Sequence, residues 1–295
     1  MKTVVMTGAT AGLGEVAAER IRRTANTRLI IGARAGRALR GTTVLPLDLA
    51  QLASVRAFAE VVFDTINGAG IDALVLNAGA QFPNIDQRTE DGFETTFAVN
   101  HLAHYLLLRL LLPQLAGHAR VVITTSDTHD PKTNPIAPPL HADAGRLAHP
   151  RLKSERRFMA GFRAYSASKL CNLLTARAVS ASPEANSRQL CVIAYNPGFT
   201  PGTSLQRAWP LPVRMLMIVI GLMRPVLRLN TTAQAGSILA EMTLGEIDPP
   251  NGRIYASLVK RHLTWPEPSD LARRNDVMNA LWCDSAKLVG LTSQA

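Results

Sequence analysis

Short runs of apolar residues alternate along the chain with longer stretches in which apolar residues recur at helical spacing. The strand-like runs lie at residues 3–7, 28–33, 43–46, 73–76, 120–125 and 190–194, with a further run near 253–256. The helix-like stretches lie at residues 14–24, 54–67, 92–115, 164–180 and 231–244. Continuous apolar strands separated by helices are typical of a parallel sheet that helices cover on both faces. The pattern predicts an α/β fold with a doubly wound sheet of about seven strands, which binds ligands at the carboxyl ends of its strands.

Two segments interrupt this alternation. Residues 127–161 include a stretch rich in Pro, His and Ala without a regular period, which predicts a loop insertion. Residues 197–230 carry five prolines and the most apolar run of the chain, 215–223, which favours a lid over the substrate. The sequence shows no internal repeat and no linker. We therefore expect residues 1–295 to form one domain that contains both segments.

Composition narrows the class of protein. The chain has 295 residues, of which 47% are hydrophobic and 18% charged, so we expect a large core rather than disorder. Three cysteines are too few for a disulfide framework and favour a reducing compartment, here the cytoplasm. The run at residues 215–223 is shorter than the roughly 20 apolar residues that a membrane span needs. We expect no transmembrane segment, although contact with a membrane surface is an alternative use of that run.

The net charge of +10 attracts anions, and two interpretations compete. Nucleic acid or an anionic membrane would use a basic patch, whereas scattered surface arginines would raise the charge without any such partner. Basic residues are spread along the whole chain in this sequence. Since nucleic-acid modules usually cluster their charge, we favour the second interpretation and expect no nucleic-acid partner.

A glycine-rich turn joins the first predicted strand to the first predicted helix. Gly8 would permit the tight turn, Gly12 would let the backbone approach a pyrophosphate, and Gly14 would let the helix pack closely on the strand. The helix N-terminus that follows offers free amides and the positive end of a dipole to phosphates. A purely structural turn is the alternative, which the position at the first strand–helix junction weakens. The turn predicts dinucleotide contacts at Gly8, Thr10, Gly12, Leu13 and Gly14.

The residues at the end of the second predicted strand indicate whether the cofactor is NAD or NADP. NAD enzymes usually place an acid here to hold the ribose hydroxyls, and Ala33 cannot do so. Arg34 could bind a 2′-phosphate through charge-assisted hydrogen bonds, which favours NADP(H) over NAD(H), although a solvated surface arginine is the alternative. Asp48 and Leu49, after the third strand, would lie beside the adenine ring.

Six motifs follow one another in an order that identifies a family. They are the glycine-rich turn, Asn77-Ala78-Gly79, Asn100, Ser126, the segment from Tyr165 to Lys169, and Pro197-Gly198. In this order the chain resembles the short-chain dehydrogenases/reductases, over about two-thirds of its length. The resemblance implies a Rossmann domain that binds a nicotinamide dinucleotide, and an enzyme that interconverts carbonyl and alcohol groups.

The chemistry of carbonyl reduction explains these residue types. The forming alkoxide needs a proton, and the unperturbed tyrosine pKa near 10 is too high for ready exchange at neutral pH. Lys169 lies one helical turn from Tyr165, so we expect its charge to lower the tyrosine pKa. Ser126 is expected to polarise the substrate oxygen; its rivals are Thr124 and Thr125, and the resemblance favours the second position of the Thr125-Ser126 pair.

The resemblance assigns further roles around this pair. Asn100 would organise a water chain from Lys169 to solvent, while a structural helix cap is the alternative role. Tyr165 and Lys169 would also contact the cofactor, with Lys169 on the nicotinamide ribose. Asn77 is expected to tie neighbouring strands together as well. The remaining predicted cofactor contacts are Asn77, Ala78, Gly79, Pro197, Gly198 and Thr200.

Within the family the chain resembles the branch of retinol dehydrogenases and light-dependent protochlorophyllide reductases. Residues 89–102, residues 165–172 and the ending at 281–291 carry this resemblance, as do the 39 positions from Ser126 to Tyr165, because the branch has an insertion there. The protochlorophyllide enzyme places a cysteine where this chain has Phe199, so carbon–carbon double-bond reduction is an alternative rather than the first expectation. An NADP(H)-binding sensor or scaffold without turnover is the other alternative.

The expected substrate is a small lipophilic carbonyl or alcohol. Phe199, Trp209 and Met215 would line an adaptable apolar pocket, although plain packing explains them equally well. His101, His104 and His129 lack carboxylate or cysteine partners at metal-ligand spacing, so we expect no metal and interpret them as surface or packing residues. The helices at residues 92–115 and 164–180 commonly form dimers in this family, which leaves a homodimer open.

Overall fold

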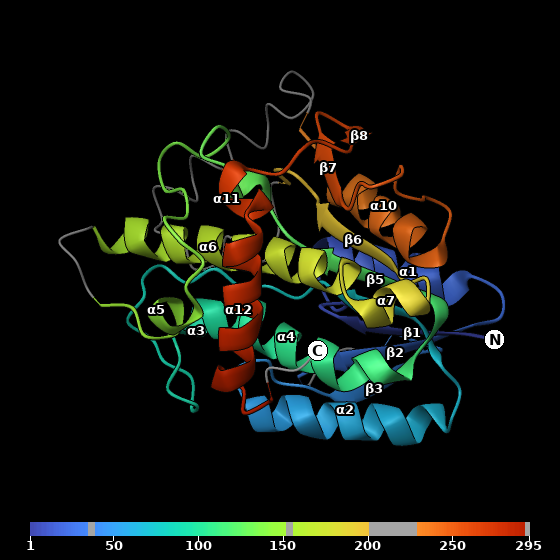
Figure 1. Ribbon diagram of the computed structural model, residues 1–295. Helices are drawn as coiled ribbons and strands as arrows, with labels where there is room; N and C mark the ends of the chain where they lie inside the picture. Colours follow the sequence, from blue (N-terminus) through green and yellow to red (C-terminus); the bar gives the residue numbers. More distant parts are fainter. Residues whose placement is uncertain (35–38, 152–155, 201–228, 293–295) are drawn as a thin grey trace.

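The computed structural model describes residues 1–34, 39–151, 156–200 and 229–292, and their strands join into one sheet (Figure 1). The strand order is β3-β2-β1-β4-β5-β6-β7-β8, in which β1 to β7 pair in parallel and β8 is antiparallel to β7. The order reverses between β1 and β4, which is the switch point where doubly wound sheets bind ligands. The strands are β1 Lys2–Thr7, β2 Thr27–Ala33, β3 Thr43–Pro46, β4 Ile71–Leu76, β5 Leu115–Thr124, β6 Cys191–Asn196, β7 Tyr255–Val259 and β8 His262–Thr264.

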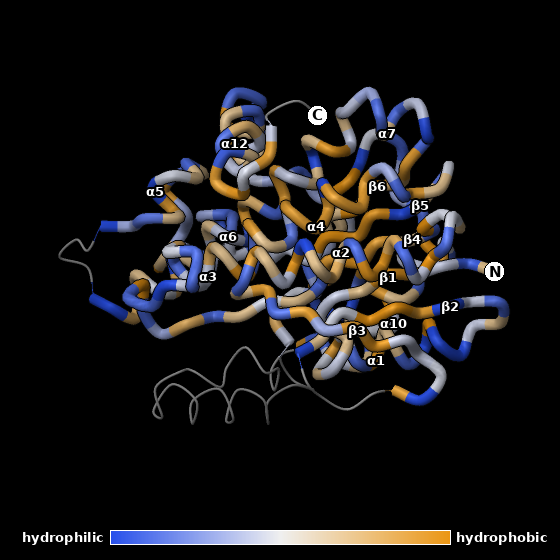
Figure 2. The backbone as a smooth tube through the Cα atoms, turned by 90° about the horizontal axis from the view of Figure 1, so that it is seen from below, coloured by the Kyte–Doolittle hydropathy of each residue, from blue (hydrophilic) through white to orange (hydrophobic). Residues whose placement is uncertain are grey.

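Helices cover both faces of this sheet, as Figure 1 shows. Alternate strand residues point to opposite faces: Val5 belongs to the core cluster that includes residues of α2, α4, α6 and α12, whereas Val4 and Met6 belong to the cluster that includes residues of α1 and α10. Figure 2 shows several of the central strands as apolar segments within the chain. The helices are α1 Gly12–Arg23, α2 Leu52–Ile66, α3 Thr95–Phe97, α4 Ala103–Leu111, α5 Ala144–Ala148, α6 Arg157–Ser180, α7 Pro183–Ser187, α10 Thr232–Leu244, α11 Asp270–Arg273 and α12 Asn275–Leu288.

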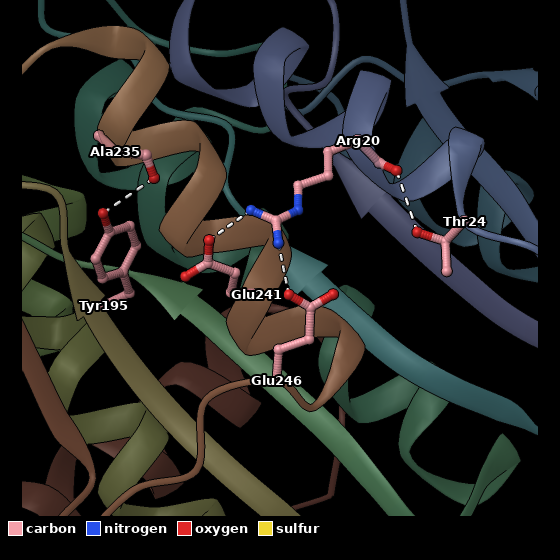
Figure 3. A network of polar contacts seen from close by, with 6 residues as sticks. All are labelled: Arg20, Thr24, Tyr195, Ala235, Glu241 and Glu246. Carbon is pink, nitrogen blue, oxygen red and sulfur yellow. Dashed lines mark hydrogen bonds and ion pairs between the residues drawn. The ribbon is translucent and has the colours of Figure 1, made fainter.

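Polar contacts fix the helices of each face to one another. Arg20 on α1 reaches Glu241 on α10 and Glu246 just beyond it (Figure 3). On the opposite face, the Tyr105 hydroxyl of α4 donates to the carbonyl oxygen of Trp282 on α12, and α12 also packs on α6. Part of the surface that the sequence analysis offered to a homodimer is therefore covered by the chain's own helix α12.

The predicted fold class is confirmed, and several elements differ from the expectation. The stretch at residues 92–115 is not one helix: the Glu94 side chain caps α3, a π-helical turn follows at Ala98–Leu102, and α4 ends at Leu111. Helix α6 begins at Arg157, seven residues before the predicted start and inside the segment predicted as a loop insertion, which also holds α5. The antiparallel strand β8 was not expected, because three residues are too few for a periodic signal.

Candidate active site

The turn after β1 has the shape that its glycines predicted. A β-carbon at Gly14 would lie 1.9 Å from the Gly8 carbonyl oxygen, and one at Gly8 would lie 2.6 Å from Ala78 Cα. Gly8 and Gly12 both have positive φ angles, of 69° and 60°, which favour glycine. A β-carbon at Gly12 would meet no atom within 4 Å, so this face of the turn is open to a ligand. An open backbone at the start of α1 fits the pyrophosphate of a dinucleotide.

Asn77 joins the ends of three neighbouring strands at the switch point. Its amide Nδ2 donates to the Gly8 carbonyl oxygen over 3.0 Å, and its Oδ1 accepts a 3.0 Å bond from the Thr124 hydroxyl. The main-chain N–H groups of Asn77 and Ala78 both donate to the Thr7 hydroxyl, each over 3.1 Å. The expected link between strands is therefore present, and Thr7, which the sequence analysis did not select, holds the same junction.

The predicted adenine-side residues lie at the ends of β2 and β3. Arg34 follows β2, is exposed, and makes no hydrogen bond or ion pair with any residue in the described ranges. Asp48 is held in its turn, because its main-chain N–H donates to the Ser54 hydroxyl and its Oδ1 accepts from the Ala50 N–H. Leu49 is half-buried against the core under α2 and α4. These positions leave the Arg34 guanidinium available to an anion.

The four predicted catalytic residues come together beyond the ends of β4 and β5. Tyr165 and Lys169 lie one turn apart on α6, and Lys169 Nζ is 5.7 Å from the centre of the Tyr165 ring. Lys169 is buried and its Nζ donates to the Thr124 carbonyl oxygen over 3.2 Å. A β-carbon at Gly79 would lie 3.2 Å from this Nζ, so Gly79 leaves room for the ammonium group. The Ser126 hydroxyl donates to the Asp127 carboxylate over 3.4 Å and accepts from the Thr128 N–H, and Ser126 lies near enough to Tyr165 to lower the pKa of its phenol.

Burial works against both charges of the tyrosine–lysine pair. It raises the pKa of Tyr165 above its ordinary value, the hydrogen bond from Ser126 lowers this pKa, and the charge of Asp127 raises it. Burial lowers the pKa of Lys169 to about 8. The expectation that Lys169 lowers the Tyr165 pKa is therefore wrong for the protein alone, because burial of the phenol sets the direction and Lys169 is not among the causes of the shift.

Asn100 lies within the π-helical turn before α4, a kind of irregularity that is frequent at functional sites. Its side chain clamps the chain beyond β4: Oδ1 accepts from the Ala80 N–H over 2.7 Å and Nδ2 donates to the Ala80 carbonyl over 2.8 Å. Nδ2 also donates to the Ser168 hydroxyl on α6 over 3.0 Å. The simple helix cap that was the alternative does not describe this residue, since its side chain joins three segments.

The turn after β6 is fixed by residues distant in the sequence. Gly198 has a φ of 64°, and a β-carbon there would lie 2.1 Å from the Leu258 carbonyl oxygen. The Asn230 amide, which the sequence analysis missed, donates to the carbonyl oxygens of Pro197 and Leu258. The Thr200 hydroxyl bonds back to Pro197 and Gly198 carbonyls within the turn. Asn230 belongs to no sequence motif, so no sequence signal pointed to this role.

The substrate residues are only partly within the described chain. Phe199 is 40% exposed beside the β6 turn, whereas Trp209 and Met215 lie outside the described residues, as does most of the predicted lid.

The three histidines are buried, so the packing interpretation holds and the surface one is wrong. Their partners differ: His101 bonds to Ser285, His104 lies between Thr7 and Asn100, and His129 bonds to the Ser126 carbonyl.

A doubly wound sheet with a glycine turn at its switch point, and beside it a half-buried Tyr165 one helical turn from the buried Lys169, is typical of nicotinamide-dependent oxidoreductases. The family model for short chain dehydrogenases matches residues 2–135. The chain is 31% identical to retinol dehydrogenase 12 of Homo sapiens over 304 residues, which cover 98% of this chain and 87% of that protein. The chain therefore belongs to the short-chain dehydrogenase/reductase family, whose members bind NAD or NADP.

Two further similarities refine this placement. Protochlorophyllide reductase A of Oryza sativa subsp. japonica is 36% identical over 201 residues, or 58% of this chain and 51% of that protein. The predicted branch, which includes retinol dehydrogenases and protochlorophyllide reductases, is confirmed. A crystal structure of an uncharacterised protein from Mycobacterium paratuberculosis aligns with a TM-score of 0.71 and 28% identity, covering 100% of this chain and 96% of that one. Among the described residues, no helix combines the length and apolarity needed to cross a bilayer.

Proposed function

We propose that the chain is an NADP(H)-dependent oxidoreductase that interconverts a carbonyl and an alcohol on a small lipophilic substrate, with Tyr165 as general acid and base. The convergence of Tyr165, Lys169 and Ser126 beside the open glycine turn carries this proposal. The three free cysteines support a reducing, cytoplasmic location.

The residues at the switch point suit a dinucleotide. The main chain from Gly8 to Gly14 would hold the pyrophosphate, and Ala78 and Gly79 would leave space beside it. Arg34 would bind the 2′-phosphate that distinguishes NADP from NAD. Pro197 and Gly198 would shape the part of the site that receives the carboxamide group of the nicotinamide. When bound, the nicotinamide supplies or accepts the hydride.

Tyr165, Ser126 and Lys169 would carry out the proton transfer to and from the substrate. In the reducing direction Tyr165 would give its phenolic proton to the substrate oxygen while the Ser126 hydroxyl holds that oxygen in place. Because burial penalises each charge separately, the phenolate and the ammonium of Lys169 are favoured together rather than singly. Lys169 would therefore remain charged while Tyr165 is deprotonated.

Asn100 would act through its main chain. Both polar atoms of its side chain are engaged with Ala80 and Ser168, which leaves the main-chain carbonyl oxygen as the group that could hold a water. A water held by that carbonyl would connect Lys169 to solvent and return the proton to Tyr165. This role differs from a direct side-chain contact with substrate.

The relatives suggest the substrate class and a second candidate reaction. Retinol dehydrogenase 12 is named for a lipophilic alcohol, which supports an apolar substrate here. The similarity to protochlorophyllide reductase A favours reduction of a carbon–carbon double bond as the second candidate. This chain has Phe199 where the resemblance leads one to expect a cysteine for that reaction, so carbonyl reduction is placed first.

The experiment is an assay of the purified protein with NADPH and NADH against aldehydes and ketones of increasing apolar area, together with an α,β-unsaturated ketone. We expect NADPH to be oxidised faster than NADH, with kcat/KM rising with the apolar area of the substrate. Tight NADPH binding without oxidation of any compound would instead identify a sensor or scaffold. A product with an intact carbonyl and a saturated double bond would identify the second candidate reaction.

A further inference from the structure

The imidazole of His104 on α4 lies between the dinucleotide turn and the catalytic residues. Its Nε2 is 2.9 Å from the Thr7 hydroxyl oxygen, and its Nδ1 is 3.1 Å from the main-chain carbonyl oxygen of Asn100. Both Thr7 and His104 are buried, with exposed fractions of 0% and 2%. The ring therefore contacts the end of β1 and the turn that carries Asn100, 97 and 4 positions away along the chain.

Counting hydrogens on the Thr7 hydroxyl fixes the tautomer of this ring. A hydroxyl has one donor hydrogen and two acceptor lone pairs. The N–H groups of Asn77 and Ala78 both donate to this oxygen and occupy the two lone pairs. The hydroxyl hydrogen is then directed to His104 Nε2, which must accept it. The ring proton consequently lies on Nδ1 and donates to the Asn100 carbonyl.

Each end of the ring touches a different part of the site. Asn77 and Ala78, which bond to Thr7, belong to the proposed cofactor lining, whereas the Asn100 carbonyl is the group proposed to hold the water beside Lys169. Burial lowers the pKa of His104 to about 4, in keeping with a neutral ring at physiological pH. Protonation of Nε2 would direct an N–H at an oxygen whose lone pairs are already used.

We infer that His104 is a positioning residue that connects the dinucleotide turn to the proton relay: as the neutral Nδ1–H tautomer it orients the Thr7 hydroxyl and the Asn100 carbonyl through one ring. The kinetic and NADPH-binding parts of this inference rest on the proposed function, while the tautomer does not. Residues that orient functional groups in this way are often as sensitive to mutation as the groups themselves.

The experiment uses variants that separate the two ends of the ring. His104→Phe removes both nitrogens, His104→Asn keeps a polar nitrogen near Nδ1, and His104→Gln keeps a polar atom near Nε2. The control is His101→Phe, because His101 is also buried and neutral, lies three residues earlier, and bonds to Ser285 on α12 instead. For each variant we would measure kcat and, by fluorescence, the NADPH Kd. The ring-nitrogen NMR signals would be recorded on the wild-type protein.

We expect His104→Phe to lower kcat by about tenfold or more and to weaken NADPH binding by about threefold, since buried groups lose their partners. His104→Asn should recover kcat in part, and His104→Gln should recover the NADPH Kd. His101→Phe should change both by less than about twofold. Equal losses in His101→Phe and His104→Phe, or a ring proton on Nε2, would overturn the inference. If the protein turns over no substrate, the NMR signals still decide the tautomer separately from the proposed function, and a ring proton on Nε2 overturns the inference.

Discussion

Substitution of two glycines in the same turn should separate cofactor binding from folding. Gly12→Ala adds a methyl group on the open face, where no atom lies within 4 Å, whereas Gly14→Ala places one 1.9 Å from the Gly8 carbonyl oxygen. An L-residue in the left-handed conformation of Gly12 costs about 1–2 kcal/mol, which corresponds to a decrease in Tm of about 2–8 °C. For Gly14→Ala the backbone itself must move, so we expect a loss of more than about 3 kcal/mol.

Gly12→Ala should affect NADPH binding more strongly than it affects stability. The Gly12→Ala methyl group would occupy the space that the pyrophosphate needs, and losing charge-assisted hydrogen bonds worth about 1.5–3 kcal/mol weakens NADPH about 10- to 100-fold. Thermal unfolding and a fluorescence titration with NADPH measure the two effects. Gly68→Ala is the control. Gly68 also has a positive φ and open space, but it precedes β4 and so lies at the amino-terminal ends of the strands, away from the proposed cofactor site. Wild-type NADPH affinity in folded Gly12→Ala would refute the assignment of this turn.

Three further predictions concern the preference for NADPH over NADH, the stability of the fold in acid, and the space beside the Lys169 ammonium group. Arg34→Asp should weaken NADPH about tenfold or more relative to NADH, because it replaces a phosphate partner with a like charge; an equal decrease in the two affinities would contradict the NADP assignment. Burial lowers the pKa of His101 to about 3 and that of His104 to about 4, so both are neutral in the folded state, while the unfolded chain takes up two protons below pH 6.5. The stabilisation from the neutral histidines is therefore fully present above pH 6.5 and is lost as the pH falls towards these folded pKa values. The free energy of unfolding, measured in urea, should decrease by about 4 kcal/mol from pH 7 to pH 5, and about half of this decrease should be absent in His101→Gln. A free energy of unfolding that does not depend on pH would disprove the burial argument. Gly79→Ala places a β-carbon 3.2 Å from Lys169 Nζ and should lower kcat several-fold while the protein stays folded, which a kcat equal to that of the wild type would exclude.

The sequence predicted those parts of the site that depend on local geometry. Gly14 packs against the Gly8 carbonyl within one strand–turn–helix unit, so the spacing of the glycines made the turn recognisable, although the contacts of Gly8 with Asn77 and Ala78 are tertiary. Tyr165 and Lys169 share a helix, and the i,i+4 spacing alone placed both on one face. The fold class followed in the same way, because apolar strands separated by helices permit few arrangements.

The parts that the sequence did not predict depend on contacts between distant residues. Thr7 and His104 meet across 97 positions, and Asn230 reaches Leu258 in a neighbouring strand, so neither pairing has a periodic signal. The direction of the Tyr165 pKa was also wrong for the protein alone, because the degree of burial is a property of the whole fold. The π-helical turn at Asn100 could not be distinguished from an α-helix by apolar spacing.

The most direct test of the account is a single-turnover measurement on Tyr165→Phe, with NADPH bound beforehand and the best carbonyl substrate added. The matched control is Tyr195→Phe, since Tyr195 is a buried tyrosine whose hydroxyl donates to the Ala235 carbonyl on the other side of the sheet (Figure 3). We predict that NADPH oxidation in Tyr165→Phe slows by about 10²–10⁴-fold while the NADPH Kd changes by less than about threefold, and that the control keeps its rate. Oxidation at the wild-type rate in Tyr165→Phe would contradict the assignment of Tyr165 as the proton donor.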